Sequence, residues 1–453
     1  MISLVKSLSR SFFKEGHERS LKVRKNVTIS FLIKGASIPV SLLLVPLTLG
    51  YINPVQYGVW LTISAIVGWM NFFDIGLGNG LKNKLAHALA LNQEEEMNKY
   101  VSTTYAAMSI IALVFFIGVS TASFFFDWNK FLNIPSSVSY SVTPVIIVVL
   151  LCCSIQFVMQ LLNTLLTATH QPSKSSVIAF IGQFATLVII FILTKTVPGN
   201  LMILVLVLAG TPIVVIFIAG LYLFRTDLKM LRPKLKNVEF RFAKSLINTG
   251  GIFFFIQMGA LILFQTDTII ITRILGPESV TVFSVSYKLF SILMMAFSII
   301  ITPFWSAFTD AFAKKDFEWI KLNIRKMRQM WLVLSLGALG LYFVSDFLFK
   351  FWIGKAVIVP LSLSLGMAFY VMAYMWQTLH VYLLNGVGKV RLQLYLVIVS
   401  SVANIPLAIF LGKKFGLVGI VSVNTFLFTI MGIVFSIQCE KIINQTSKGI
   451  WNK

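Results

Sequence analysis

The chain has 453 residues, of which 57% are hydrophobic and 12% are charged, and its formal net charge is +22. Soluble domains carry about 25% charged residues, so this composition excludes an ordinary soluble protein and indicates a lipid bilayer. The basic residues lie in short segments between apolar runs, which is how membrane topology is encoded, and this placement argues against nucleic-acid binding. Cys152, Cys153 and Cys439 have no metal-ligand spacing, so we expect free thiols and no metal site.

Residues 1–26 form a basic segment with seven Lys and Arg residues. The segment has neither a long apolar core nor a small-residue cleavage site, so we expect no cleavable signal peptide. Its alternating apolar and basic faces instead predict a cytoplasmic amphipathic helix at the membrane interface, leading into the first span.

Twelve apolar runs follow, each of about 19–25 residues, the length needed to cross ~30 Å of hydrocarbon. They lie near 28–50, 58–78, 100–122, 141–163, 176–195, 200–224, 246–272, 279–302, 329–350, 360–384, 392–411 and 418–439. We therefore predict an all-α polytopic membrane protein. Of the 38 Lys and Arg residues, 29 fall on the side that holds both termini and 7 on the opposite side, which places the termini in the cytoplasm.

A weak internal repeat organises these spans. Asn53-Pro54 and Gly276-Pro277 both follow an odd-numbered span, 223 residues apart, and Gly199-Asn200-Leu201 resembles Phe415-Gly416-Leu417. Six spans per half, both halves starting inside, predict two lobes related by a pseudo-two-fold axis along the membrane normal. We place the lobes at 27–224 and 246–440, joined by a basic cytoplasmic linker at 225–245 and followed by a cytoplasmic tail at 441–453.

Catalytic motifs are missing from the sequence. It has no Gly-rich phosphate-binding loop ending in Lys-Ser or Lys-Thr, no HExxH and no Gly-x-Ser-x-Gly elbow. We therefore predict no enzyme, no catalytic residue and no cofactor. Energy from ATP within this chain is not expected, which leaves a proton or sodium gradient.

Two spans carry serine, threonine and a single lysine at helical spacing. The first stripe reads Ser30, Lys34, Ser37, Ser41, Leu44 and Thr48, and the second reads Ser284, Lys288, Ser291, Met295, Ser298 and Thr302. The spacing i, i+4, i+7, i+11 puts each stripe on one face of a helix. Since a charge facing lipid is costly, two cationic stripes suggest an interior path for something anionic. The candidate substrate-binding residues are Lys34, Lys288, Ser37, Ser41, Ser284 and Ser291.

Each lysine also has a structural interpretation. Lys288 lies nine residues into its span, about 14 Å deep, where an ion pair with Asp267 is the alternative to a functional role. Lys34 lies nearer the cytoplasm, where it can snorkel or pair with Asp74. Asp74 and Asp267 are thus candidates for ion pairing or ion coupling, and Asp267 is the one carboxylate well inside a span. Serines alone also suit ordinary contacts between membrane helices.

Other spans offer weaker candidates. Arg273 falls at the outer mouth, where it is an interfacial anchor or a ligand. Tyr370, Tyr374 and Gln377 share one helical face, which suits either contact with sugar rings or ordinary packing. Pro39 and Pro46 predict a bend in the first span.

Several segments resemble one known family. The run Tyr51-Ile-Asn-Pro-Val-Gln-Tyr-Gly-Val-Trp60, followed by Phe73-Asp-Ile-Gly-Leu-Gly-Asn-Gly-Leu-Lys-Asn-Lys-Leu-Ala86, is similar to the first two spans of Wzx-type polysaccharide-unit flippases. Asp267-Thr268-Ile-Ile-Ile271, Leu275-Gly-Pro-Glu-Ser-Val280 and Tyr287-Lys288-Leu289 resemble that family's seventh and eighth spans. The similarity extends over nearly the whole chain.

The resemblance implies two six-helix lobes around a cavity that opens alternately to each side of a bacterial inner membrane. It implies transport of undecaprenyl-diphosphate-linked oligosaccharide units from the cytoplasmic to the periplasmic leaflet, for O-antigen or capsule assembly. Basic cavity residues of the family are thought to bind the anionic head group. Lys288 matches such a position after the tyrosine, whereas Lys34 is assigned from its stripe alone.

The implied partners are the lipid-linked substrate, membrane lipid and other membrane proteins of polysaccharide assembly, with no nucleic acid. The alternative is a cation-coupled exporter of drugs or other small molecules from the same superfamily. The sodium-coupled drug exporters use buried acidic residues in the first lobe, and the first span of this chain has no carboxylate in its middle.

Overall fold

A computed structural model describes residues 18–68, 77–90, 93–134, 141–169, 171–242, 266–302, 304–354 and 356–452. Within these residues the chain is helical and contains no strand. The labelled α-helices are, in chain order, α2 (Glu18–Tyr51), α3 (Pro54–Gly68), α4 (Leu77–Ala90), α5 (Glu94–Phe124), α6 (Trp128–Phe131), α7 (Thr143–Met159), α8 (Leu161–Ala168), α9 (Pro172–Thr196), α10 (Leu201–Leu223), α12 (Pro277–Ile301), α13 (Phe304–Ala313), α14 (Phe317–Ile353), α15 (Leu361–Val387) and α16 (Arg391–Ile443). Short 3₁₀ helices are η2 (Lys229–Leu231), η3 (Leu235–Asn237) and η4 (Gly449–Asn452), and residues 266–275 form a further helix without a label.

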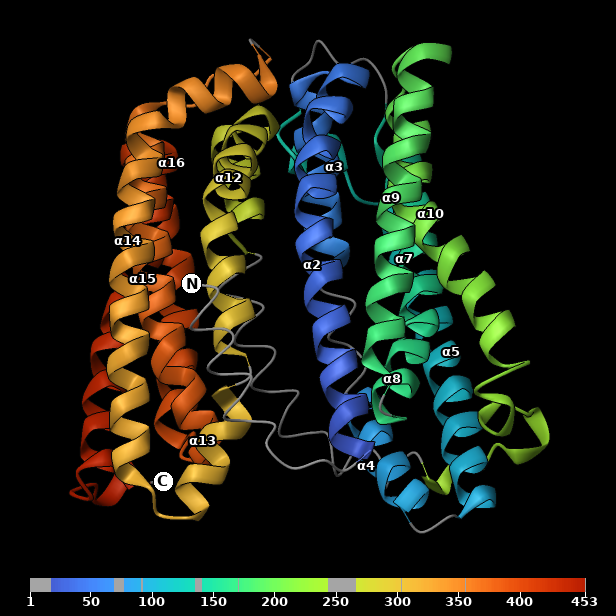
Figure 1. Cartoon of the computed structure of the whole chain (residues 1–453). Helices are drawn as coiled ribbons and strands as arrows, with labels where there is room; N and C mark the ends of the chain where they lie inside the picture. Colours follow the sequence, from blue (N-terminus) through green and yellow to red (C-terminus); the bar gives the residue numbers. More distant parts are fainter. Residues whose placement is uncertain are drawn as a thin grey trace.

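The helices divide into two lobes that stand side by side (Figure 1). α2 to α10 form the first lobe, and α12 to α16 form the second. Helix 266–275 joins the second lobe, since Ile270 and Ile271 pack with Ala408 and Ile420 of α16. The lobes meet where α12 packs against α3 and α2. The two-lobe, all-helical prediction is confirmed.

Seven helical segments of the described chain are long and apolar enough to cross a membrane. They are Glu94–Phe124, Thr143–Ala168, Pro172–Thr196, Leu201–Leu223, Pro277–Ile301, Phe317–Ile353 and Arg391–Ile443. The last contains two predicted spans, because the backbone at Gly416 (φ 61°, ψ −142°) leaves helical geometry and the chain turns there. Of the predicted span 246–272, the part before 266 lies outside the described residues, as do 69–76 of the span 58–78.

The surfaces of these helices are apolar where a bilayer would surround them. On α14, for example, Phe343 and Phe347 are 79% and 69% exposed. The interior contains a different set of large side chains, with Phe290, Phe297 and Phe435 fully buried. Apolar side chains thus lie both on the lipid-facing side and on the inward-facing side of these helices. Contact with lipid and burial inside the protein together account for the high hydrophobic content of the chain.

Two prolines that the repeat relates begin equivalent helices. Pro54 opens α3 and Pro277 opens α12, positions where the missing amide hydrogen costs nothing. The two helix starts also pack against each other across the lobes: Thr281 Oγ1 donates to the Pro54 carbonyl at 2.6 Å. A Cβ on Gly58 would lie 1.7 Å from the Pro277 carbonyl oxygen, so glycine is required at this contact.

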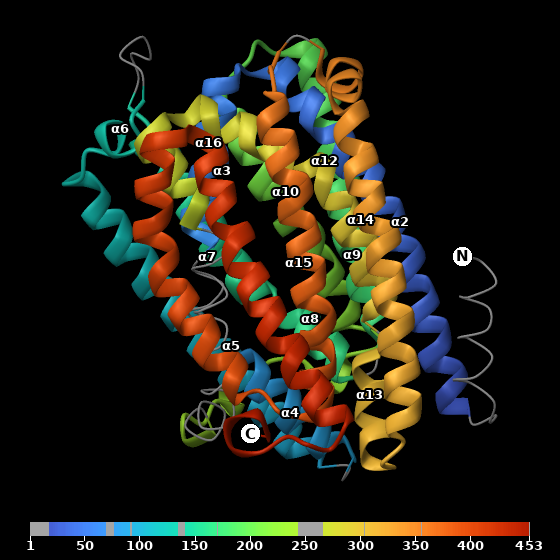
Figure 2. The ribbon, with the colours of Figure 1, turned by 90° about the vertical axis from the view of Figure 1, so that its left-hand side faces the viewer.

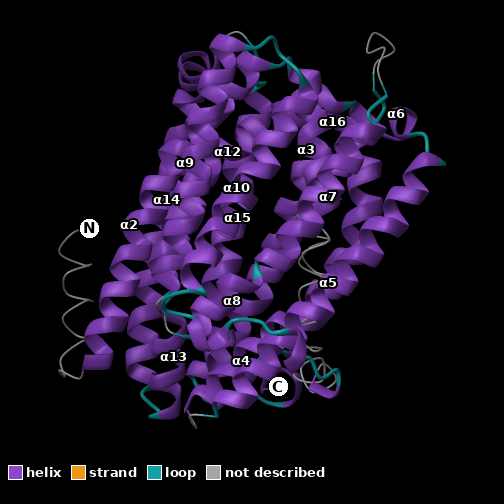
Figure 3. Ribbon diagram, turned by 90° about the vertical axis from the view of Figure 1, so that its right-hand side faces the viewer, coloured by secondary structure: helices purple, strands orange, loops and turns teal. Residues whose placement is uncertain are grey.

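The two ends of the molecule differ in what they contain. α6 and the bend of α16 lie at one end, and α4, α13 and the C-terminus lie at the other (Figures 2 and 3). The first end also holds the turns that precede Pro54 and Pro277, which the distribution of basic residues places outside the cytoplasm. We refer to it as the predicted outer end.

The first span is longer than the sequence predicts. α2 begins at Glu18 and continues through the predicted boundary at residue 26, while residues 1–17 lie outside the described part of the chain. Both Pro39 and Pro46 lie inside α2. The predicted span 141–163 falls within the segment Thr143–Ala168, in which α7 ends at Met159 and α8 begins at Leu161.

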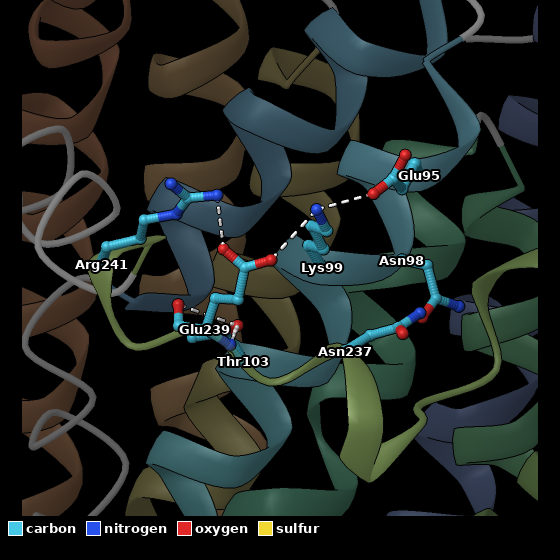
Figure 4. A network of polar contacts seen from close by, with 7 residues as sticks. All are labelled: Glu95, Asn98, Lys99, Thr103, Asn237, Glu239 and Arg241. Atoms are coloured by element: carbon cyan, nitrogen blue, oxygen red, sulfur yellow. Dashed lines mark hydrogen bonds and ion pairs between the residues drawn. The ribbon is translucent and has the colours of Figure 1, made fainter.

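Residues 225–242 of the predicted linker lie against the first turns of α5 (Figure 4). Asn98 is the centre of this contact. Its Nδ2 donates to the carbonyls of Met230 (3.0 Å) and Arg232 (2.9 Å), and its Oδ1 accepts from Asn237 Nδ2 (2.7 Å). One buried amide thus fixes the linker to the first lobe at three points.

A charged group adds a second attachment beside Asn98. Glu239 forms ion pairs with Lys99 (3.0 Å) and Arg241 (2.6 Å), and its backbone amide donates to Thr103 Oγ1 (3.0 Å) (Figure 4). The hydrogen bond from Lys99 lowers the pKa of the Glu239 carboxyl below its ordinary value of 4.5, and the charge of Arg241 acts in the same direction. The carboxylate form therefore holds the linker.

Candidate functional site

A cavity of about 330 Å³ lies between the two lobes. α2 and α3 of the first lobe and α12 of the second line it. Ser41 comes from the first predicted stripe, and Ser284, Lys288 and Ser291 come from the second. The structure thus brings four predicted residues together from helices more than 200 residues apart in the sequence.

Lys288 is the charged residue on the described cavity wall. Its side chain is half-buried, and no ion pair involves its ammonium group within the described parts of the chain. The hydroxyl of Ser291 donates to the Lys288 carbonyl at 2.9 Å, which fixes the orientation of that serine. An ammonium group that faces a cavity without a carboxylate is suited to receive an anion.

Two tyrosines outside the predicted stripes, Tyr57 and Tyr287, also line the cavity. Tyr287 lies between Ser284 and Ser291 on the same helical face, so the spacing of the stripe contained this signal. Its ring meets Tyr370 edge-on, with centroids 6.0 Å apart. No spacing in the sequence indicated Tyr57, because this residue reaches the cavity only through the contact between the lobes. Tyrosines offer apolar faces and hydroxyl groups that suit a sugar.

Only part of the first stripe lines the described cavity wall. Ser41 lines the cavity, whereas Ser37 is absent from the described wall and its hydroxyl donates to the Ile33 carbonyl at 2.9 Å. Thr48, further along, is buried in the core. The side chain of Lys34 and all of Asp74 lie outside the described residues, so the roles assigned to them stay predictions.

Asp267 does not pair with Lys288, which was the structural alternative for that lysine. Its Oδ2 instead accepts a hydrogen bond from Asn424, whose Oδ1 accepts from Asn404 at 2.9 Å. The Oδ1 atoms of both Asp267 and Asn404 are buried and have no protein partner in the described structure. The carboxylate therefore belongs to a buried polar chain inside the second lobe.

Tyr370, Tyr374 and Gln377 lie in packed surroundings rather than on the described cavity wall. The rings of Tyr370 and Tyr374 both meet Phe428 edge-on, at centroid distances of 5.5 and 5.7 Å. Gln377 lies against α16, where a Cβ added to Gly432 would lie 3.3 Å from the backbone nitrogen of Gln377. Their positions match the packing interpretation, so the contact with sugar stays a prediction.

Arg273 bridges the two lobes at the predicted outer end. Its Nη1 donates to the carbonyls of Lys130 (3.1 Å) and Phe131 (3.3 Å), and its guanidinium group lies 5.5 Å from the Phe131 ring centroid. Both acceptors belong to α6 of the first lobe, whereas Arg273 lies on helix 266–275. The residue is thus an interlobe contact as well as an exposed cation.

Other interlobe hydrogen bonds gather toward this end of the described molecule. Thr62 Oγ1 and Thr272 Oγ1 are 2.6 Å apart, and both residues are buried. Trp352 Nε1 donates to the Leu42 carbonyl at 2.9 Å. Together with the bond from Thr281 to Pro54, these contacts hold the lobes together on the outer side of the cavity.

The described residues contain no group of three or more His, Cys, Asp or Glu side chains that could hold a metal ion. Cys152, Cys153 and Cys439 are free thiols.

The sequence matches a known family over more than half its length. A model of the "Polysaccharide biosynthesis protein" family covers residues 23–308. The chain belongs to the polysaccharide biosynthesis protein family. The matched region contains the first lobe, the linker and α12, and therefore every residue of the described cavity wall.

Two relatives of this family member are similar over much of its length. It is 23% identical to a Yersinia pseudotuberculosis protein named "Putative O-antigen export protein", over 74% of this chain and 76% of the relative. It is 21% identical to the "Uncharacterized membrane protein EpsK" of Bacillus subtilis, over 69% of this chain and 63% of the relative.

Solved structures show the same fold. An inward-facing multidrug resistance transporter of the MATE family, within the MOP superfamily, superposes with a TM-score of 0.75 at 13% identity, covering 92% of this chain and 98% of its own. An outward-facing MATE transporter gives 0.61 at 13% identity, covering 94% and 97%. A MOP superfamily transporter from Pyrococcus furiosus gives 0.61 at 12% identity, with coverage of 94% and 97%. This member of the polysaccharide biosynthesis protein family is thus a multi-pass protein of the bacterial inner membrane, with the fold of these MOP superfamily structures.

Proposed function

We propose that the protein is a flippase that moves undecaprenyl-diphosphate-linked oligosaccharide units from the cytoplasmic to the periplasmic leaflet, for O-antigen or capsule assembly. The observation that carries this proposal is Lys288, an ammonium group without a carboxylate partner in a described interlobe cavity. The named export relative and the family support a role in polysaccharide export, and they favour a transporter over an enzyme.

The cavity offers the chemistry that a sugar diphosphate requires. Lys288 supplies a cation for the diphosphate, and the hydroxyls of Ser41, Ser284 and Tyr57 offer hydrogen bonds to phosphate or sugar oxygens. Its volume of about 330 Å³ lies at the small end of typical ligand sites, so it fits the diphosphate with an adjoining sugar. The lipid tail remains in the bilayer, where burying it costs nothing.

Alternating access is the mechanism that the arrangement of the lobes supports. The interlobe hydrogen bonds described above lie toward the predicted outer end, which corresponds to a molecule closed on that side. The better superposition on the inward-facing transporter than on the outward-facing one agrees with this conformation. In the proposal, substrate enters from the cytoplasmic side, and breakage of the outer contacts releases it.

The proposed energy source is a proton or sodium gradient acting on Asp267. This buried carboxylate has one oxygen without a protein partner in the described structure, which gives a proton or a sodium ion a place to bind. Its location in the second lobe separates the ion from the cavity, so coupling would act through movement of the helices.

Replacing Lys288 tests the function. Lys288→Ala should reduce translocation of a fluorescent lipid-linked oligosaccharide in proteoliposomes by at least about tenfold, since each lost charge-assisted contact is worth roughly 1.5–3 kcal/mol. Lys288→Arg keeps the charge and should retain most of the activity. Lys321→Ala, which removes an exposed cation outside the cavity, is the control. Normal surface polysaccharide and normal flipping with Lys288→Ala, at equal protein levels, would contradict the proposal.

The alternative is an exporter of small cationic molecules, and the MATE fold fits it equally well. A cationic drug is expected to require acidic groups in the cavity, whereas the described wall contains a lysine and no carboxylate. Survival of cells on toxic cationic dyes distinguishes the two. Protection that Lys288→Ala increases, with polysaccharide unchanged, would favour the exporter.

A further inference from the structure

A second cavity, of about 670 Å³, lies at the predicted outer end on the boundary between the lobes. Helix 266–275 and α16 supply most of its wall, and Phe131 of α6 supplies the contribution from the first lobe. Two cations, Arg273 and Lys413, line it together with aliphatic side chains such as Ile270 and Ile409. We refer to it as the outer groove.

Basic residues are scarce on this side of the membrane, yet they gather at the outer groove. Of the seven Lys and Arg residues predicted outside, Arg273 and Lys413 line the groove, while Lys130 and Lys414 are the chain neighbours of Phe131 and Lys413. None of these four side chains forms an ion pair within the described residues. Asp127, the nearby acid that caps the start of α6, accepts from the Lys130 backbone amide. The groove therefore carries net positive charge where topology does not require it.

The guanidinium group of Arg273 is only partly used by the protein. The recorded bonds run from Nη1 to the α6 carbonyls, and its remaining N–H groups have no recorded partner in the described structure. These bonds fix the side chain at the rim of the groove with donors left for a phosphate oxygen.

The remaining wall is apolar and continues onto the surface that faces lipid. Ile409 is 38% exposed, and the adjacent Phe410 is 65% exposed on the outside of α16. No described lining residue carries an amide or hydroxyl side chain, in contrast to the interlobe cavity with its serines and tyrosines. This apolar part of the wall suits an acyl chain and offers no hydrogen bond to a sugar.

The geometry points to a binding site for an anionic glycerophospholipid of the outer leaflet, with its phosphate on Arg273 and Lys413 and an acyl chain along the groove. Apart from its two cations, the described wall has no hydrogen-bonding side chain, which favours this lipid over the glycan-bearing substrate of the proposed function. Because Phe131 belongs to one lobe and the cations to the other, the bound lipid spans the lobe boundary.

Native mass spectrometry of the full-length protein in detergent tests the site. Phosphatidylglycerol should bind at least tenfold more tightly than phosphatidylcholine. In Arg273→Ala/Lys413→Ala its dissociation constant should rise about 25-fold, from roughly fivefold for each cation. Lys195→Ala/Lys350→Ala removes the same charge from the predicted outer side without touching the groove, and should leave binding unchanged. Equal losses in the two double variants, or equal affinity for both lipids, would overturn the proposal.

A second variant covers the case in which loss of Arg273 disturbs the fold. Lys413 makes no recorded hydrogen bond in the described structure, so Lys413→Ala alone should weaken phosphatidylglycerol about fivefold and Lys413→Arg should restore it. Phosphatidylglycerol with a photoreactive acyl chain should label peptides within 266–275 and 405–415. Labelling elsewhere, or displacement by a polyprenyl-diphosphate oligosaccharide but not by unlabelled phosphatidylglycerol, would reject the phospholipid assignment. Neither readout depends on transport activity.

Discussion

Asp267, Asn424 and Asn404 form a short polar chain inside the second lobe, and each is at most 5% exposed. A buried carboxylate depends on its hydrogen-bond donor, because loss of that donor leaves a desolvated charge unpaired. Asn424→Leu should therefore lower the free energy of unfolding by about 2–4 kcal/mol, measured by thermal unfolding in detergent.

The matched variants separate charge from packing. Adding Asp267→Asn to Asn424→Leu removes the unpaired charge and should recover at least half of the loss. Thr429→Ala removes an exposed hydroxyl that bonds within α16 and should change stability little. An Asn424→Leu protein as stable as the wild type would show that the carboxylate does not depend on this donor.

Gly58 is a second residue whose identity follows from its surroundings. An added Cβ would overlap the Pro277 carbonyl, a backbone atom that moves only if α3 and α12 separate. Overpacking of this kind costs about 1–3 kcal/mol. Gly58→Ala should therefore shift the molecule toward conformations open at the predicted outer end.

Spin labels on Asn53 and Glu278, which are exposed at the starts of α3 and α12, measure this shift as a longer distance in double electron–electron resonance. Gly118→Ala is the matched control, since nothing lies within 4 Å of the added Cβ. A distance distribution unchanged by Gly58→Ala would mean that this contact does not control the outer side.

At the scale of elements, the linker is attached to α5 by a titratable group. The pKa of Glu239 lies below its ordinary value of 4.5, so ionisation favours the attached form. This contribution is fully present above pH 4.5 and is lost as the pH falls through the lowered pKa. Hydrogen exchange of residues 229–241 should accelerate in that acidic range beyond its intrinsic pH dependence.

Glu239→Gln removes the titration and should give faster exchange at neutral pH with no additional acid-induced step. Glu95→Gln is the control, because this exposed residue pairs with Lys99 but does not contact the linker in the described structure. If the acid-induced step persists in Glu239→Gln, a titratable group other than Glu239 controls the attachment of the linker.

At the scale of the whole molecule, alternating access requires the outer interlobe contacts to break. Thr62 and Thr272 face each other across the lobes with their hydroxyls 2.6 Å apart. A disulfide between cysteines at these positions should therefore lower the transport rate by at least about tenfold, and a reductant should restore the rate. Flipping assays in proteoliposomes before and after reduction measure the effect, with the native cysteines replaced.

The single variants Thr62→Cys and Thr272→Cys should transport normally under both conditions. Full activity of the cross-linked protein would show that the lobes do not separate here, and would exclude a mechanism in which this end opens.

Much of the architecture follows from local sequence. The apolar runs, the prolines at 54 and 277 and the turn at Gly416 gave helices close to those predicted, because a bilayer leaves few alternatives to a helix of about 20 apolar residues. The second stripe was informative for the same reason, since residues three and four apart share a helical face wherever that helix lies. Four of its residues, Ser284, Lys288, Ser291 and Met295, do line the cavity.

Contacts between distant segments decided the rest. The sequence placed a lysine and an aspartate at membrane depth. In the folded lobe Lys288 lines a cavity, whereas Asp267 accepts a hydrogen bond from Asn424. Tyr57 joined the site, while Tyr370 and Tyr374 packed on Phe428, because which face of a helix meets its neighbour depends on how the lobes assemble. Spacing along one helix determines which residues point the same way. What they point at is set by the packing of helices hundreds of residues apart, which local periodicity does not contain.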